Sequence, residues 1–258
     1  MSGPILIFDS GVGGLSVIAP LRRRLPDAAL VYACDNAMMP YGTRPDEWLV
    51  KRILSVCSAA VAASGCKVLV VACNTASTLA LDVLRDCLAV PVVGTVPAIK
   101  PAAESSQSRH IGLLATSATV SRPYTDRLIR DFAADCRVTR VAADALVGQA
   151  ERLLAGETPD RCIIRDATSP LWAVGDLDTV VLGCTHFPLL SAYIAEAAPR
   201  GVRLVDSGEA IARRTAQVIR RPAPRGGCDR SFATALDARL SRALEAFGFD
   251  APQLLPLD

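Results

Sequence analysis

Short apolar runs alternate along the chain with longer segments in which apolar residues recur at helical spacing. Several of the short runs are apolar on both faces, which is typical of parallel strands that helices cover on each side. The sequence Thr-Arg-Pro-Asp at 43–46 resembles a helix-capping sequence and predicts a helix that runs to Ser64. This alternation predicts βαβ units, an α/β fold with parallel sheets, and ligands at the carboxyl ends of the strands. The predicted strands are Ile5–Phe8, Leu30–Ala33, Val68–Ala72, Val90–Val93, Ile111–Ala115, Val138–Val141, Thr179–Leu182 and Val202–Val205.

Two of these strands end on a cysteine that is followed by a hydroxyl or amide residue. The first continues into Cys73-Asn74-Thr75 and the second into Cys184-Thr185-His186. Free cysteines are among the most buried residues, so each could be a structural core thiol. Their shared context favours chemistry instead, because two thiols at matching positions of two similar half-chains can approach one substrate atom from opposite sides. Moving a proton from one face of a carbon to the other needs such a pair.

A weak internal repeat supports two related halves. An early strand ends Phe8-Asp9-Ser10-Gly11 and a late one ends Val205-Asp206-Ser207-Gly208, although Asp-Ser-Gly is also common turn chemistry. We therefore expect two pseudo-symmetric parallel-sheet α/β domains that face each other across a central cleft. The first is expected to comprise residues 1–97 and 208–258, and the second residues 98–207. The basic segment 221–227 is interpreted as a flexible, solvated connector before a last helix over 237–247.

Composition excludes several classes of protein. The chain has 258 residues, of which 51% are hydrophobic and 21% charged, as in ordinary globular domains. The net charge of +2 gives no electrostatic case for a nucleic-acid or membrane partner. No apolar stretch approaches the ~20 residues that span a bilayer. The N-terminus meets Asp9 after a few apolar residues and is interpreted as a strand rather than a signal peptide, so we expect a cytoplasmic protein.

Cysteine and lysine usage limits the possible cofactors. Nine cysteines at irregular spacing, without a Cys-x-x-Cys pair, indicate reduced thiols. Zinc held by Cys73, Cys184 and His186 is disfavoured because structural zinc sites present close cysteine pairs. Pyridoxal phosphate needs a Schiff-base lysine, and none of the few lysines stands at a convincing site. We expect no metal and no cofactor.

The glycine-rich segment 9–14, Asp-Ser-Gly-Val-Gly-Gly, follows a predicted strand and precedes a helix. Its backbone N–H groups could face an anion. It lacks the Gly-Lys-[Ser/Thr] of a Walker loop and is not a full dinucleotide fingerprint, so a small carboxylate is the better candidate. Asp9 offers a partner for a substrate ammonium group. The alternative is a tight turn capped by Ser10.

Other polar residues surround these strand ends. Gly42 in Pro40-Tyr41-Gly42 permits close backbone approach to a ligand, although a plain turn is an equal alternative. His110 precedes an apolar strand and is interpreted as structural. His186 lies two residues after Cys184 and could relay its proton. Short side chains suited to fixing a carboxylate or amino group stand beside the thiols at Asn74, Thr75 and Thr185.

These motifs resemble, in order, the signature blocks of the glutamate racemase family. The resemblance runs from the first strand to about Arg221. Gly-Cys-Thr-His favours glutamate, since related aspartate racemases usually carry Glu where His186 stands. The blocks are Asp9 to Val17, Pro40-Tyr41-Gly42, Ala72 to Ser77, Val96 to Pro101, Ala115 to Val120 and Gly183 to Leu190.

The resemblance implies cofactor-independent interconversion of L- and D-glutamate, which supplies D-glutamate for peptidoglycan. It implies that Cys73 acts on the α-proton of the D-enantiomer and Cys184 on that of the L-enantiomer. Asp9 and His186 would be supporting acid–base groups and Glu151 a partner of His186. The chain departs from the family at Gly148, where many members have Pro. We also expect a homodimer with no nucleic-acid or membrane partner. His186 is also expected to contact the substrate. The residues expected to hold the amino-acid end are Asp9, Ser10, Asn74, Thr75 and Thr185; those expected to hold the side-chain carboxylate are Tyr41, Gly42, Thr116 and Thr119.

Two other functions are compatible with the sequence. Another racemase, isomerase or decarboxylase of the same superfamily would share the fold and accept aspartate or a different acid. A binding protein that regulates a partner such as a DNA topoisomerase, a side role reported within the family, is a hypothesis of another class. It would leave both thiols without a purpose, and an activity assay distinguishes it from catalysis.

Overall fold

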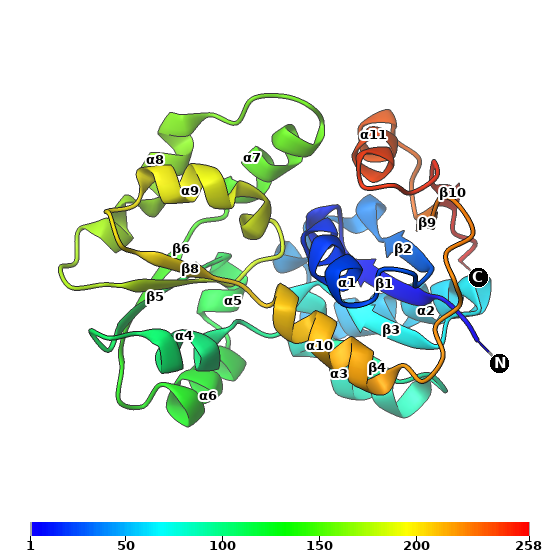
Figure 1. The fold of residues 1–258 in the computed structure, drawn as a ribbon, viewed down its shortest axis with the longest axis horizontal. Helices are drawn as coiled ribbons and strands as arrows, with labels where there is room; N and C mark the ends of the chain where they lie inside the picture. The colour runs from blue at the N-terminus through cyan, green and yellow to red at the C-terminus, as the bar shows by residue number, and fades with distance from the viewer. Residues whose placement is uncertain (1, 258) are drawn as a thin grey trace. The chain divides into compact units, whose positions relative to one another are not determined.

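The computed structural model describes residues 2–257, which form two compact units (Figure 1). The first unit contains the chain up to Thr95 and again from Gly208 onward, and the second contains Val96–Ser207. The chain thus leaves the first unit once and returns to it once, in each case shortly after a strand has ended.

The first unit is built on a six-stranded parallel sheet with the strand order β10-β9-β2-β1-β3-β4. Three of these six strands, β1, β2 and β3, are buried at every position, because helices cover both faces of the sheet. The strands are β1 (Ile5–Asp9), β2 (Leu30–Cys34), β3 (Val68–Val71), β4 (Val92–Gly94), β9 (Arg230–Ala233) and β10 (Gln253–Leu254).

The second unit has a four-stranded parallel sheet with the order β6-β5-β7-β8. The two inner strands are buried at every position, whereas the two edge strands are partly exposed. The strands are β5 (His110–Ala115), β6 (Arg137–Ala142), β7 (Thr179–Leu182) and β8 (Arg203–Val205).

The two sheets share one topology. In each unit the second strand pairs with the first, the first with the third, and the third with the fourth, so β1, β2, β3 and β4 correspond to β5, β6, β7 and β8. In an open parallel sheet, ligands bind outside the carboxyl ends of the strands at the point where the strand order reverses. That point lies between β1 and β3 in the first unit and between β5 and β7 in the second. Cys73 follows β3 and Cys184 follows β7.

Helices cover both faces of each sheet. In the first unit, α2 and α3 pack on one face and α1 lies beside α10 on the other. In the second, α4 and α6 lie on one face and α8 and α9 on the other (Figure 1). The helices are α1 (Ile18–Arg24), α2 (Asp46–Ser64), α3 (Asn74–Cys87), α4 (Ile99–Ser105), α5 (Ser117–Val120), α6 (Pro123–Phe132), α7 (Ala145–Leu154), α8 (Arg161–Trp172), α9 (Ser191–Ala197), α10 (Gly208–Val218) and α11 (Ala238–Ala246), with 3-10 turns η1 (Gly13–Val17), η2 (Asn36–Met38), η3 (Tyr41–Thr43) and η4 (Phe187–Leu190).

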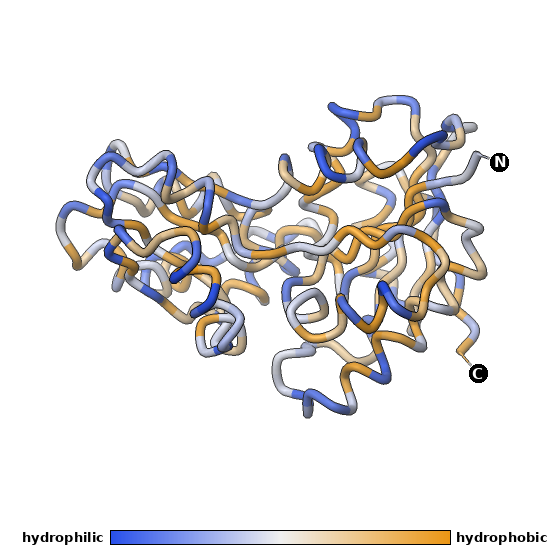
Figure 2. Tube along the Cα trace, turned by 90° about the horizontal axis from the view of Figure 1, so that it is seen from below, coloured by the Kyte–Doolittle hydropathy of each residue, from blue (hydrophilic) through white to orange (hydrophobic). Residues whose placement is uncertain are grey.

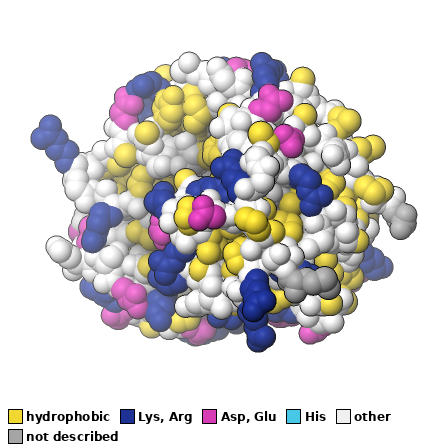
Figure 3. Space-filling model, turned by 45° about the vertical axis from the view of Figure 1, so that its right-hand side comes forward, with side chains coloured by type: hydrophobic (Ala, Val, Ile, Leu, Met, Phe, Trp, Pro, Cys, Tyr) yellow, Lys and Arg dark blue, Asp and Glu magenta, His cyan; other side chains and the backbone are white. Residues whose placement is uncertain are grey.

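Burial follows the apolar pattern of the sequence. Figure 2 shows apolar stretches alternating with hydrophilic ones along the trace of each unit. Most of the largest fully buried side chains lie in strands. Charged side chains of both signs are scattered over the face shown in Figure 3, in keeping with 28 basic and 26 acidic residues. Within residues 2–257, no helix is long and apolar enough to cross a membrane.

The predicted α/β fold with parallel sheets is confirmed, and all eight predicted strands are present within two residues of their expected bounds. The sequence pattern missed β9 and β10, which are short and lie at one edge of the first sheet. The predicted long helix is present and runs from Asp46 to Ser64. Its capping position is Pro45 rather than Thr43, whose hydroxyl donates to the Pro40 carbonyl.

Two further expectations need correction. The segment 221–227 is not a free connector, because its backbone pairs with the chain near Gly3 and near Ala28. The Asp-Ser-Gly repeat does not mark equivalent positions either. Asp9 ends the first strand of its unit, whereas Asp206 follows the fourth strand of the other. The pseudo-symmetry lies in the strand order and in the two cysteine strands.

Candidate active site

Asp9 ends β1 at the reversal point of the first sheet, and its side chain is fully buried. The Gly14 N–H donates to Asp9 Oδ2 at 2.6 Å, and the Tyr32 hydroxyl donates to the Gly11 carbonyl at 2.8 Å. A Cβ on Gly14 would lie 2.8 Å from both Asp9 Cβ and the Tyr32 hydroxyl oxygen. The glycine loop is therefore packed closely against the end of β1 and fixes the Asp9 carboxylate.

Cys73 stands at the N-cap of α3, immediately beyond β3. The Ala76 N–H donates to its Sγ at 3.5 Å, and the Ser10 Oγ lies 3.6 Å from the same sulfur. The first turn of a helix presents unsatisfied N–H groups and a positive dipole end, both of which favour a negative charge. This position suits a thiolate, and Ser10 adds a hydroxyl that can donate to it or accept from the thiol.

Asn74 and Thr75 form the first residues of α3 and are more than nine-tenths buried. Asn74 Oδ1 is buried without a hydrogen-bond partner among residues 2–257. A buried amide oxygen that lacks a partner costs about 1–3 kcal/mol. The oxygen therefore favours a ligand with an N–H or O–H donor beside Cys73.

Tyr41 lies in η3 and is buried, whereas the next residue, Gly42, is exposed. The Tyr41 hydroxyl donates to Asp35 Oδ2 at 2.8 Å. Burial and the neighbouring Asp35 raise the pKa of Tyr41 well above its usual value, so the phenol stays neutral and remains a donor. The side chain of Tyr41 is thus engaged inside the unit, and the exposed part of this turn is Gly42.

In the second unit, Cys184, His186 and Glu151 form a connected series. The Sγ of Cys184 lies 3.8 Å from Nδ1 of His186, and Nε2 of His186 lies 2.8 Å from Oε1 of Glu151. His186 is buried, Cys184 is half-buried, and the Glu151 side chain is 31% exposed. The carboxylate can hold the imidazole in one orientation and stabilise its protonated form, which lets a proton move between Cys184 and the ring.

The other predicted site residues of the second unit follow strands β5 and β7. Thr185 is buried between Cys184 and His186. Thr116 and Thr119 lie just after β5, with their hydroxyl oxygens 3.2 Å apart. Since β5 and β7 are neighbours, these threonines and Cys184 lie at the same edge of the sheet.

The described residues contain no group of three or more His, Cys, Asp or Glu side chains that could hold a metal ion. The titratable side chains described above, apart from the two tyrosines, are thiols, an imidazole and carboxylates. Such groups perform proton transfer.

Known proteins resemble this chain over most of its length. The family model described as Asp/Glu/hydantoin racemase matches residues 16–215. The glutamate racemase of Shewanella woodyi is 50% identical over 220 residues, which cover 85% of this chain and 82% of the relative. That of Pectobacterium carotovorum is 44% identical over 260 residues and covers 98% and 91%. This chain belongs to the glutamate racemase family.

A solved structure agrees with this membership. The crystal structure of Escherichia coli glutamate racemase in complex with L-glutamate and the activator UDP-MurNAc-Ala superposes with a TM-score of 0.95 at 40% identity, and covers 100% of both chains. The predicted resemblance to glutamate racemases is confirmed, and so is the class of enzyme, an isomerase that acts as an amino-acid racemase.

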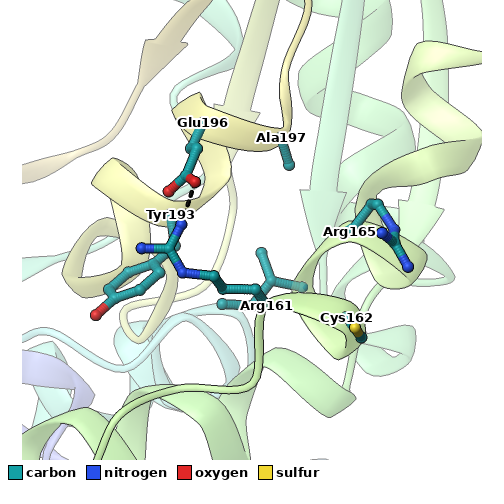
Figure 4. A pocket seen from close by; sticks show the side chains of 7 residues that line it. Arg161, Cys162, Arg165, Tyr193, Glu196 and Ala197 are labelled. Atoms are coloured by element: carbon teal, nitrogen blue, oxygen red, sulfur yellow. Dashed lines mark hydrogen bonds and ion pairs between the residues drawn. The ribbon is translucent and has the colours of Figure 1, made fainter.

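One pocket of about 330 Å³ lies between α8 and α9 of this racemase family member and contains none of the predicted site residues (Figure 4). Its Arg161 forms an ion pair with Glu196 and lies over the Tyr193 ring at 5.5 Å. These side chains satisfy one another, so we assign the pocket no part in racemisation.

Sequence reasoning missed three residues beside the candidate site. Asp35, directly after β2, is fully buried and accepts hydrogen bonds from Tyr41, from Arg52 on α2 and from Thr234 after β9. The position of Asp35 directly after a strand could have marked it as a candidate site residue. No sequence pattern pointed to Arg52 or Thr234, because their proximity to Asp35 depends on how α2 and β9 pack.

Proposed function

We propose that the protein is a cofactor-independent glutamate racemase in which Cys73 and Cys184 are the two acid–base groups. The observation that supports this most directly is topological. The two thiols follow equivalent strands, β3 and β7, at the reversal points of two sheets with the same strand order. The relatives that the chain resembles over most of its length are glutamate racemases.

In the proposed reaction, one sulfur takes the α-proton as a thiolate while the other, as a thiol, delivers a proton to the opposite face of Cα. With L-glutamate, the Cys184 thiolate removes the proton and the Cys73 thiol donates one; with D-glutamate the roles reverse. The two sulfurs exchange protonation states in each turnover, so the enzyme returns to its starting form only by the reverse reaction or by exchange with solvent.

The surroundings of the two sulfurs favour these roles. The first turn of α3 and the Ser10 hydroxyl can stabilise a thiolate at Cys73. The imidazole of His186, held by Glu151, can exchange a proton with Cys184. Neither sulfur needs a metal or an organic cofactor for this step.

The substrate would be held at both ends. Asn74, whose Oδ1 lacks a partner among residues 2–257, together with the Asp9–Ser10 loop and Thr75, provides groups for the ammonium and α-carboxylate. Preorganised donors at the carboxylate stabilise the charge that develops when Cα loses its proton. We assign the distal carboxylate to the Tyr41–Gly42 backbone and to the hydroxyls of Thr116 and Thr119.

We further propose that the product D-glutamate serves peptidoglycan synthesis, as the family resemblance implies, and that the enzyme acts in the cytoplasm as a homodimer. Growth of a D-glutamate auxotroph on expression of the chain tests the first assignment. Sedimentation of the purified protein tests the homodimer.

The central experiment is incubation of the purified, reduced protein with L- or D-glutamate in D₂O without added cofactor. We expect loss of optical activity, with solvent deuterium entering mainly the product enantiomer, as two-base chemistry requires. Deuterium entering substrate and product equally would indicate a single base and contradict the two-thiol route. No exchange with either enantiomer would contradict the proposed function.

Substitution of each thiol assigns the two faces. Cys73→Ser and Cys184→Ser should each lower racemisation by about 10²–10⁴-fold, the usual contribution of an acid–base group. Each variant should keep Cα–H exchange only with the enantiomer whose proton its remaining thiol removes. Cys87→Ser, which changes an exposed cysteine at the end of α3, is the matched control and should retain full activity.

A further inference from the structure

The buried carboxylate of Asp35 accepts hydrogen bonds from three side chains, which come from η3, from α2 and from the segment after β9. The Tyr41 hydroxyl donates to Oδ2 at 2.8 Å, and Arg52 donates to Oδ2 at 2.8 Å and to Oδ1 at 2.6 Å. The Thr234 hydroxyl donates to Oδ1 at 2.7 Å. We call Asp35, Arg52 and Thr234 the Asp35 cluster.

The ion pair between Asp35 and Arg52 is largely shielded from water. Asp35 is fully buried and the Arg52 side chain is 19% exposed. A bidentate guanidinium–carboxylate pair fixes geometry as well as charge, and it allows a carboxylate to stay ionised where water does not reach it. The member of this network that belongs to the predicted site is Tyr41, so the cluster acts on the site through the turn that contains Tyr41.

The segment after β9 also contacts the residues that lead into the Tyr41–Gly42 turn. Beyond β9, the Thr234 hydroxyl accepts from the Ala37 N–H at 3.1 Å, and the side chain of Asn36 exchanges hydrogen bonds with the backbone of Ala235 at 2.8 and 3.1 Å. Residues about 200 positions apart in the sequence are thereby joined just before the turn. The segment that follows β9 thus fixes residues 35–37, which lead into the Tyr41–Gly42 turn.

We propose that the Asp35 cluster positions the Tyr41–Gly42 turn and so determines the length of the dicarboxylate that the site accepts. The inference depends on the proposed function, in which this turn holds the distal carboxylate. Tyr41 packs in the same core cluster as Cys73, so the turn and the thiol belong to one rigid part of the first unit. Aspartate is shorter than glutamate by one methylene group, and a fixed distance from thiol to turn discriminates between the two.

Asp35, Arg52 and Thr234 are positioning residues in this proposal, since none is assigned a contact with the substrate. Arg52→Met removes the bidentate partner, and Thr234→Val removes only the contact from the C-terminal segment. Both should raise the KM for glutamate, Arg52→Met by about tenfold, because small displacements of a binding group are costly. The inhibition constant of aspartate should change less, so that selectivity for glutamate falls in both variants while kcat changes little.

The first unit offers a matched control. Arg22 forms an ion pair with the buried Asp229, and the exposures of the two side chains, 19% and 2%, are close to those of Arg52 and Asp35, 19% and 0%. Arg22→Met should therefore cost comparable stability, yet it should leave the KM for glutamate and the selectivity unchanged.

The results of these experiments distinguish a failure of the proposed function from a failure of the positioning role. A wild-type protein that does not racemise glutamate contradicts the proposed function itself. An active wild type whose folded Arg52→Met and Thr234→Val variants keep the wild-type KM and selectivity overturns the positioning role and leaves the proposed function intact. An equal rise in KM in Arg22→Met assigns the effect to general destabilisation and also overturns it. If Arg52→Met does not fold, as circular dichroism would show, Thr234→Val decides alone.

Discussion

The imidazole of His186 lies with Nε2 2.8 Å from the Glu151 carboxylate, although 35 residues separate the two in the sequence. Its Nδ1 faces the Cys184 sulfur at 3.8 Å. The ring therefore stands between a thiol and a carboxylate, and its orientation depends on Glu151. Activity should accordingly depend on a residue that does not itself reach the thiol.

Glu151→Gln tests this dependence. The amide can still hold the ring but no longer stabilises a positive charge on it, so we expect kcat/KM to fall about tenfold, less than the 10²–10⁴-fold of a direct acid–base group. The equilibrium constant between enantiomers is one, so the fall must be equal with L- and D-glutamate. Polarimetry with both enantiomers measures it.

The control for this variant is Glu104→Gln on α4, which changes a carboxylate that is 66% exposed and weakly paired with Lys100. It should leave both rates unchanged. Wild-type kinetics in Glu151→Gln would show that the contact with His186 is dispensable for proton transfer.

Gly14→Ala should damage both stability and activity. The added methyl would meet Asp9 Cβ and the Tyr32 hydroxyl oxygen at 2.8 Å and Ala72 Cβ at 3.2 Å, none of which can move freely because all three belong to the central strands of the sheet or their ends. Overpacking of this kind costs about 1–3 kcal/mol. Urea denaturation should show the loss, and kcat/KM should fall because the Asp9 carboxylate is displaced.

Gly148→Ala is the matched comparison on α7. No heavy atom lies within 4 Å of the place that an alanine Cβ would take, and the residue is exposed in the helix. Alanine should therefore stabilise the protein by about 0.5–1 kcal/mol. A stability loss in Gly148→Ala, or none in Gly14→Ala, would contradict the conclusion that the space beside Gly14 is too small for a methyl group.

Asp178 should contribute stability that disappears in acid. Burial acts to raise its pKa, but hydrogen bonds from the hydroxyls of Ser106 and Thr179 and the N–H groups of Gln107 and Ser108, at 2.7–2.9 Å, outweigh burial and hold the pKa well below its usual range. A carboxyl group with a depressed pKa in the folded state stabilises the fold above its unfolded pKa of about 3.9, and the contribution is lost as the pH falls through the lower folded value.

Asp178→Asn should lower the free energy of unfolding at pH 7 by about 1 kcal/mol, at the low end for hydrogen bonds to a charged acceptor because solvent screens this partly exposed carboxylate. Denaturation at pH 7 and at pH 3 should show a smaller difference from wild type at the lower pH. An equal difference at both values would mean that the charge of Asp178 adds nothing to its hydrogen bonds.

Thiol alkylation should divide the cysteines into classes. Burial raises the pKa of Cys57 well above its usual value, so this thiol should resist iodoacetamide in the folded protein. Glutamate should protect the half-buried Cys184 and leave the rates at the exposed thiols unchanged, as peptide mass spectrometry can show. Protection that fails at Cys184 would argue against its place in the substrate site. The exposed thiols are Cys87, Cys162 and Cys228, and the fully or nearly fully buried ones outside the site are Cys34, Cys57 and Cys66.

Much of the fold and part of the site could be predicted from local patterns. A strand such as β7 is a continuous apolar run because both of its faces are covered, and Cys184 at its end is placed by that run alone. The short strands β9 and β10 lacked such a run: half of the four residues of β9 are polar, and β10 has only two residues, both exposed. Thr43 does not cap the helix because it lies in η3, two residues before the capping position at Pro45, and its hydroxyl donates to the Pro40 carbonyl.

Local sequence patterns were enough to predict which residues lie at the carboxyl ends of strands, because hydrophobic periodicity and turn chemistry are local properties of the chain. They thereby placed Asp9, Cys73 and Cys184. Tertiary structure alone decided which side chains meet across the chain: Glu151 against His186, and Thr234 and Arg52 against Asp35. These contacts depend on how whole helices and strands pack, and no local pattern encodes the distance between atoms that the chain brings together only on folding.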